Sequence, residues 1–125
     1  GGIAIGAEAL TVSGTGADEV GALRNLDGQN SFAGDVTFAA AATLTSVAGE
    51  LSLTGALAAG GHTLTVNGAG DLIFASTLAD AVDLVKTGAG KLTFSADQVF
   101  SGEVTLGGGT LAFADADVSI ATLRV

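Results

Sequence analysis

Residues 86–113 read KTGAGKLTFSADQVFSGEVTLGGGTLAF, and this stretch decides the fold of the chain. It contains three short runs in which apolar and polar residues alternate, each entered through a glycine: residues 90–94, 102–106 and 109–113. Alternation with a period of two puts one face of an extended strand inward and the other outward. Glycine tolerates the backbone angles that tight corners require. The stretch therefore predicts three short strands joined by glycine corners.

The composition narrows the class of protein. The 125 residues include 20 Gly and no Pro, Cys, Met, Trp or Tyr, and 48% of them are hydrophobic. A chain this apolar is expected to fold, while its many Gly, Thr and Val residues disfavour helices. Because cysteine is absent, the chain has no disulfide and no thiolate metal site. We predict a single domain over residues 1–125, of which residues 1–30 are the least regular.

The charge excludes two kinds of partner. The net charge is −9, and the basic residues are Arg24, Lys86, Lys91 and Arg124. Binding to nucleic acid or to an anionic membrane surface needs several clustered cations, so neither partner is expected. The long uncharged stretch at residues 51–70 carries five glycines, and we therefore expect no insertion into a membrane.

A repeat of about twenty residues runs through almost the whole chain. The first series of strand centres is Ile3, Leu23, Leu44, Leu64, Leu84, Val104 and Leu123. The second series begins near Val12, passes Phe32 and continues with Leu53, Phe74, Phe94 and Phe113. The third series links Val36, Leu57, Leu78, Val99 and Val118. Three interleaved series with one period predict an all-β fold, a single-stranded parallel β-helix (β-solenoid) of about six coils, each of roughly 20 residues with three short strands.

Stacking of the coils would create the core of such a solenoid. One coil cannot bury its own apolar face, whereas stacked coils align Leu, Val and Phe in continuous inward ladders. We expect Phe38, Phe74, Phe94 and Phe113 to point inward, and the directions of Phe32 and Phe100 stay open. An antiparallel sandwich is the weaker alternative, because Asn67-Gly68 is the only hairpin signal in the chain.

Two pairs of acidic residues would stack on the outside of the solenoid. Asp83 lies over Glu103, and Asp97 lies over Asp117 with Asp115 nearby. Calcium prefers clustered carboxylates, but neither pair belongs to a recognised calcium-binding loop. We therefore predict no metal site and no cofactor, with calcium as the open alternative. Separately, Lys91 is expected to pair with Asp71 one coil away.

No catalytic constellation is found in the sequence. His62 is the sole histidine and follows Gly60-Gly61, which predicts a turn that faces water instead of a catalytic triad. Lys86-Thr87 lacks the upstream glycines of a phosphate-binding loop. A polysaccharide enzyme acting through Asp83 or Glu103 is a remote alternative, because the chain has no Tyr or Trp. We predict that the protein is not an enzyme, with no catalytic, cofactor-binding or metal-binding residues.

Residues 86–113 resemble the passenger-associated repeat of bacterial autotransporters. That repeat has a KTGAG corner, a strand, a polar corner that ends in Ser-Gly, and a second strand followed by Gly-Thr-Leu. The chain has KTGAGKLTF, DQVFSG and EVTLGGGTLAF in this order, and GQNSFAGDVTF at residues 28–38 carries the polar corner again. The resemblance implies a right-handed β-helix that is secreted or lies on a bacterial cell surface, with an adhesive or stalk role.

Two functions are expected from these observations. In the first, the protein is an extracellular structural β-helix whose copies stack head to tail into a fibre, with Ile3 of one copy against Leu123 of the next. In the alternative, it is a segment of an adhesin passenger that contacts host or neighbouring cells through an outer face or a loop near residues 14–20. We expect the chain to be a processed passenger, a fragment of one, or a small secreted relative.

Overall fold

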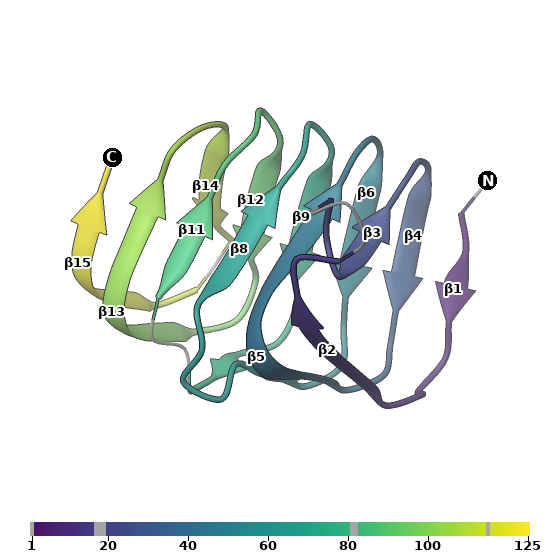
Figure 1. Cartoon of the computed structure of the whole chain (residues 1–125), viewed down its shortest axis with the longest axis horizontal. Helices are drawn as coiled ribbons and strands as arrows, with labels where there is room; N and C mark the ends of the chain where they lie inside the picture. The colour runs from purple at the N-terminus through teal and green to yellow at the C-terminus, as the bar shows by residue number, and fades with distance from the viewer. Residues whose placement is uncertain (1, 17–19, 81–82, 115) are drawn as a thin grey trace.

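The chain winds into a stack of turns along one axis (Figure 1). This computed structural model describes residues 2–16, 20–80, 83–114 and 116–125. Within these ranges every strand pair is parallel, and the strands form two sheets. The all-β solenoid that the repeat predicts is confirmed.

The first sheet contains one strand from each turn. In their order across the sheet these strands are β1 (Ala4–Ile5), β4 (Gln29–Phe32), β6 (Glu50–Leu53), β9 (Asp71–Phe74), β12 (Lys91–Phe94) and β14 (Thr110–Phe113). Six stacked strands are joined by five passages of the chain around the axis. The described chain therefore makes about five turns, slightly fewer than the six coils predicted.

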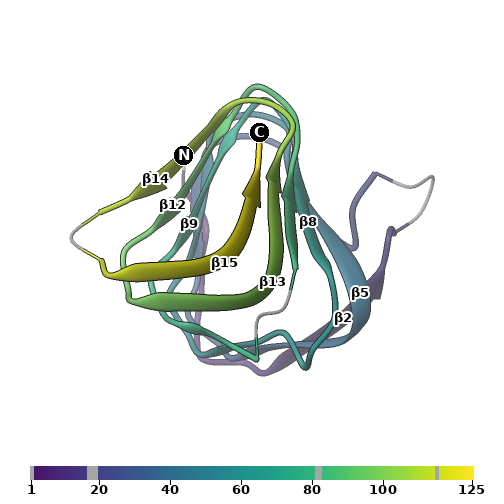
Figure 2. The ribbon, with the colours of Figure 1, turned by 90° about the vertical axis from the view of Figure 1, so that its left-hand side faces the viewer.

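The second sheet bends around a corner and forms the other two sides of a roughly triangular cross-section (Figure 2). Three of its strands run continuously around this corner: β5 (Val36–Ser46), β13 (Gln98–Leu106) and β15 (Val118–Arg124). In the other turns this path is divided between shorter strands: β2 (Leu10–Gly14), β3 (Leu23–Asn25), β7 (Leu57–Ala58), β8 (Leu64–Asn67), β10 (Leu78–Ala79) and β11 (Leu84–Lys86).

Inward ladders fill the space between the sheets. One ladder of the first sheet runs through Ile5, Phe32, Leu53, Phe74, Phe94 and Phe113. Each of these residues lies over the next because the strands pair in register at the spacing of one turn. Full burial of a Leu or Phe side chain contributes about 1.5–3 kcal/mol. The ladder therefore supplies stability along the whole axis.

The first turn differs from the prediction. Ile3 does not continue the Leu23 series, because β1 pairs with β4 in the first sheet and Ile5 lies beside Phe32. Val12 pairs with Phe38 in the second sheet and does not begin the phenylalanine ladder. The cause is the length of the first turn, since β1 and β4 are 27 residues apart (Ala4 with Ser31) while later turns take 19 to 21.

The third predicted series breaks at Val99. Leu78 is buried, but Val99 is 64% exposed, and the two neighbours of Val99, Gln98 and Phe100, point inward. Gln98, twenty residues after Leu78, therefore occupies the inward position one turn later. Sequence hydropathy pointed to Val99 because a valine is a more usual core residue than a glutamine.

Candidate functional site

A buried lysine closes the corner that leads from β11 into β12. Lys86 is 2% exposed, and its ammonium group donates hydrogen bonds to the main-chain oxygens of Thr87 (2.8 Å) and Gly88 (3.4 Å). Burial lowers the pKa of Lys86, and the negative charge of Asp71 opposes part of this shift. A buried cation must have hydrogen-bond partners for its donors. The two corner carbonyls supply them, and the lysine in turn stabilises the conformation of the corner.

Glycines allow the turns to stack closely at this corner. Gly88 has a φ of 79°, in the left-handed region that favours glycine. A Cβ atom at Gly90 would overlap the main-chain oxygen of Gly70 on the preceding turn. The main chains of the two turns therefore lie close enough to bond directly, and the N–H of Gly90 donates to the main-chain oxygen of Gly68 (3.1 Å). These glycines are therefore corner residues, as the sequence predicts.

The equivalent corner of the earlier turns is held by amide and hydroxyl groups. Asn25 is buried at the end of β3, and its side-chain amide donates to the hydroxyl of Ser46 (3.1 Å) and the main-chain oxygen of Ala48 (3.0 Å). The side chain of Asn30 donates in turn to the Asn25 oxygen (2.5 Å). Neighbouring turns are thus tied together by buried polar side chains at this side of the triangle.

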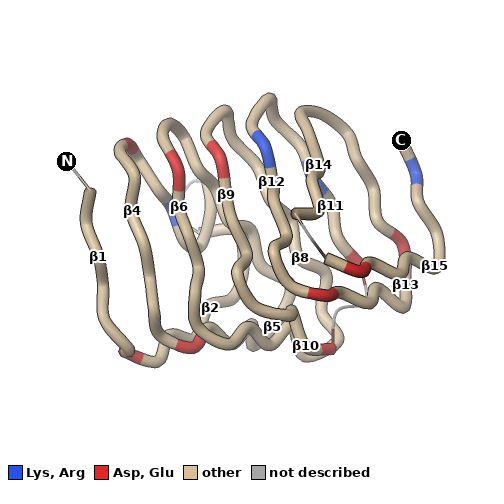
Figure 3. Tube along the Cα trace, turned by 180° about the vertical axis from the view of Figure 1, so that it is seen from behind, with Lys and Arg blue, Asp and Glu red and all other residues tan. Residues whose placement is uncertain are grey.

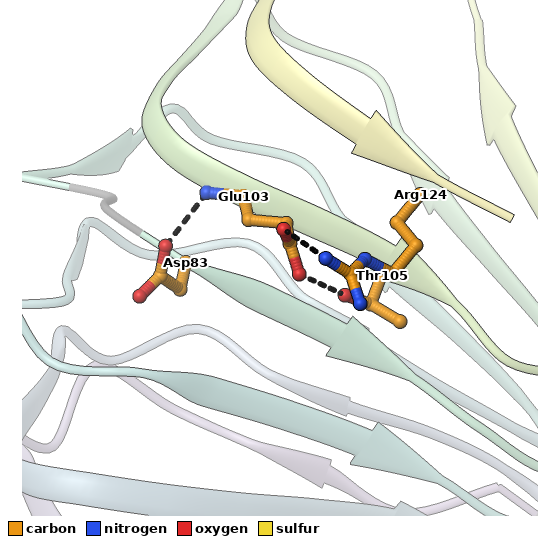
Figure 4. A network of polar contacts seen from close by, with 4 residues as sticks. All are labelled: Asp83, Glu103, Thr105 and Arg124. Atoms are coloured by element: carbon orange, nitrogen blue, oxygen red, sulfur yellow. Dashed lines mark hydrogen bonds and ion pairs between the residues drawn. The ribbon is translucent and has the colours of Figure 1, made fainter.

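The stacked acids Asp83 and Glu103 do not face one another (Figure 4). One Asp83 oxygen accepts a hydrogen bond from the main-chain N–H of Glu103 (2.6 Å). The Glu103 carboxylate turns away and accepts from the hydroxyl of Thr105 (3.1 Å), and it lies 3.3 Å from the guanidinium of Arg124. Because both members of this ion pair are solvent-exposed, it contributes only about 0–1 kcal/mol.

The contact made by Asp83 recurs along the solenoid. An aspartate oxygen accepts the main-chain N–H of a residue one turn later, and the other pairs are Asp35 with Ala56 (3.0 Å), Asp71 with Lys91 (2.9 Å) and Asp97 with Asp117 (2.9 Å). The expected pairing of Lys91 with Asp71 is therefore made by the lysine main chain and not by its ammonium group. Sequence reasoning missed this role, although the spacing of 20 or 21 residues was visible.

The described residues offer no preformed metal centre. Within residues 2–16, 20–80, 83–114 and 116–125, no three His, Asp or Glu side chains are grouped so that they could hold a metal ion. Asp115 lies outside the described residues, as does part of the loop near residues 14–20. Calcium binding and a ligand-binding loop at those places stay predictions.

His62 lies in the turn from β7 to β8, as predicted. Its main-chain N–H donates to the oxygen of Ala59 (3.1 Å). The imidazole is half-buried beside Gly60 instead of facing water fully.

Aromatic residues belong to the core. Five of the six phenylalanines are buried, including Phe32 and Phe100, and Phe113 on the last turn is 38% exposed. Phe94 meets the rings of Phe74 and Phe100 edge to face, and it stacks on Phe113 at 5.9 Å. These rings therefore pack against one another inside the solenoid.

Comparison with known proteins identifies the segment around the Lys86 corner. Residues 84–113 match the family model described as passenger-associated-transport-repeat. The match begins with β11 and ends with β14, so it covers about one and a half turns of the solenoid. No curated protein and no solved structure matches the chain. The described part of the chain contains no helix long and apolar enough to cross a membrane.

Proposed function

We propose, from the premise that residues 84–113 are an autotransporter passenger repeat, that this chain is a rigid, non-enzymatic structural segment of a passenger at a bacterial cell surface. One observation carries the proposal. The repeat is continuous with the preceding turns, since β11 pairs with β8 and β12 pairs with β9 in register. A repeat that continues its neighbours' sheets extends a rod, and solenoid rods are held by such nearest-neighbour contacts.

The use of the polar side chains supports a structural role. Lys86 bonds corner carbonyls, and Asp83 bonds the main chain of the next turn. Glu103 is engaged by Arg124 and Thr105. These charged side chains are therefore engaged within the solenoid: the contacts of Asp83 with Glu103 and of Glu103 with Arg124 join successive turns, and those of Lys86 hold a corner within one turn. A surface location agrees with the acidic charge and the absence of cysteine in the sequence.

Surface display tests this function. The chain would be placed between a secretion signal and an autotransporter translocation unit, and intact cells would be treated with protease. We expect the chain to reach the surface and to resist cleavage, because a folded solenoid exposes few extended loops. The matched variant Phe94→Asp, which disrupts the core, should be cleaved. Retention of the wild-type chain inside the cell, or cleavage as fast as the variant, would contradict the proposal.

A second candidate function is head-to-tail assembly of copies into a fibre. It is favoured by the apolar residues that the two end turns of this chain expose, among them Ile5 (48% exposed) and Leu123 (55%). The register changes the contact expected from the sequence: Ile3 cannot lie against Leu123, because β1 belongs to the first sheet. In a continuous stack, β1 would pair with β14 and Ile5 would lie on Phe113. Such a contact is heterologous and propagates.

Analytical ultracentrifugation of the 125-residue chain tests the fibre. We expect a sedimentation coefficient that rises with concentration, and we expect Ile5→Asp to abolish the rise. Val47→Asp, at an exposed site away from the end turns, is the matched control and should not alter the association. A monomer at all concentrations would contradict the fibre and leave the passenger function standing.

A further inference from the structure

The second sheet has a step between β10 and β13. On one side β10 pairs with β7, but on the other side the side chain of Gln98 takes the place of a strand. Its oxygen accepts the main-chain N–H of Leu78 (2.8 Å), and its amide donates to the main-chain oxygen of Leu78 (2.8 Å). Gln98 thus mimics a peptide group and leaves β13 set apart from β10.

The step produces a groove on the outside of the solenoid. The chain of the preceding turn is divided into β10 and β11, whereas β13 and β15 run continuously around the corner. Seen along the axis, these two strands lie nearer to the centre than the strands of the preceding turns (Figure 2). The space left beneath them has a volume of about 570 Å³, which lies within the range of ligand-binding pockets.

The lining of the groove combines apolar and acidic side chains. Leu78, Val99 and Val118 supply the apolar part, and Asp80, Asp97 and Asp117 supply the acidic part. Val99 is the most exposed of the apolar group, at 64%. One oxygen of Asp97 accepts the Asp117 N–H, and among the described residues the carboxylates of Asp80 and Asp117 have no hydrogen-bond or ion-pair partner.

No cation of the chain neutralises these acids. Figure 3 shows acidic residues along both edges of the solenoid, while the basic residues lie in its upper half and none is seen along the lower edge. None of the four basic residues of the chain lines the groove. An unneutralised acidic groove attracts cations, and an exposed valine within it offers apolar contact area.

We propose that this groove binds an extended segment of a partner protein that presents basic and apolar side chains on one and the same face. In an extended segment every second side chain shares a face, so an apolar residue on that face would meet Val99 while Lys or Arg residues two positions before and after it meet Asp80 and Asp117. A second copy of this chain does not fit, because its four basic residues stand singly and no segment of it presents Lys or Arg on both sides of an apolar residue. A sugar does not fit either, since no aromatic residue lines the groove.

Fluorescence anisotropy with a labelled peptide Lys-Ser-Val-Ser-Lys-Ser-Val, which carries Lys and Val on one face when extended, tests the proposal. We expect saturable binding that weakens with salt, and little binding of the matched peptide Glu-Ser-Val-Ser-Glu-Ser-Val. The double variant Asp80→Asn with Asp117→Asn should weaken binding roughly tenfold, equivalent to the loss of about 1.4 kcal/mol. In the NMR spectrum of the labelled protein, the peptide should shift the amide signals of the groove residues.

A matched control separates the groove from the overall charge. Glu8→Gln with Glu50→Gln removes the same charge at residues that do not line the groove, and it should leave the affinity within about twofold. An equal loss in this control would overturn the proposal in favour of non-specific attraction. The absence of saturable binding would also overturn it, as would saturable binding of CaCl₂ that the peptide cannot displace. Neither result would affect the structural role proposed above.

Discussion

At the scale of single residues, the solenoid is held by side chains that bond the main chain of a neighbouring segment. Gln98 bonds both polar groups of Leu78, and Lys86 bonds two corner carbonyls. The alternation in Leu84-Val85-Lys86 places the lysine on the inward side, and the structure keeps it there. Hydropathy alone argues against both positions, because Lys and Gln are rarely buried.

The buried lysine predicts an unusual pH dependence. Because burial lowers its pKa, the unfolded chain holds the Lys86 proton more tightly than the folded chain does. The free energy of unfolding should therefore rise with pH between the lowered pKa and the usual value of 10.5. The variant Lys86→Met should lack this rise. Urea denaturation followed by circular dichroism at pH 7, 9 and 11 measures the difference.

The alkaline range is favourable for this experiment. The chain has no Tyr or Cys, whose titration would interfere. Lys91→Met is the control, because Lys91 is exposed and its removal should leave the slope as in the wild type. If Lys86→Met showed the wild-type slope, the lysine would not be buried as described.

Gln98 predicts a loss of stability that an exposed neighbour does not share. Gln98→Ala leaves the main-chain N–H and oxygen of Leu78 without partners, which costs about 1–3 kcal/mol for buried groups. Val99→Ala removes an exposed side chain and should change the free energy of unfolding by less than about 0.5 kcal/mol. Chemical denaturation compares the two variants. Equal effects would show that Gln98 makes no special contribution.

At the scale of the elements, the period of the sequence predicts which strands exist but not always which residues lie in register. Leu53, Phe74, Phe94 and Phe113 stack as predicted. Val99 was predicted inward because hydropathy favours it over Gln98, and hydrogen bonds of the glutamine side chain reverse this choice. Contacts of this kind depend on groups one turn away, and a local pattern of apolar residues does not reveal them.

The corner glycines differ in whether they have space for a Cβ atom. Gly90→Ala should destabilise the fold by about 1–3 kcal/mol, the usual cost of overpacking, because its Cβ would overlap the oxygen of Gly70. Gly107→Ala in the same repeat meets its nearest neighbour at 3.4 Å, an ordinary contact, and should be tolerated. Thermal unfolding of both variants measures the contrast, and equal melting temperatures would contradict the close stacking described at Gly90.

At the scale of the whole molecule, the solenoid architecture could be predicted because three series share one period. The candidate site could be predicted only in part. The sequence identified the acids at positions 83, 97, 103 and 117, but not the main-chain bonds that occupy Asp83 and Asp97. The position of the first strand also escaped prediction, because the longer first turn places Ile3 out of phase with the later period.

Stability should depend on how many turns flank a residue. Phe94→Ala removes a ring that contacts Phe74 and Phe113 in the ladder and Phe100 on the second sheet, and it should cost about 3–5 kcal/mol. Phe113→Ala, on the last described turn and partly exposed, should cost less than half as much. The midpoints of urea denaturation measure both changes. Equal costs would mean that the last turn is packed as tightly as the interior of the ladder.

The constant register between turns also determines how the length of the rod can change. Successive turns of the first sheet pair in register at a spacing of 19 to 21 residues, so a turn is the repeating unit of the rod. Removal of residues 71–90 would join Gly70 to Lys91, the same junction that Gly90 now makes, and every inward residue beyond it would stay inward. Removal of a single residue would reverse inside and outside along a strand. Such a rod can lengthen or shorten over evolution by whole turns, while smaller changes are confined to its corners.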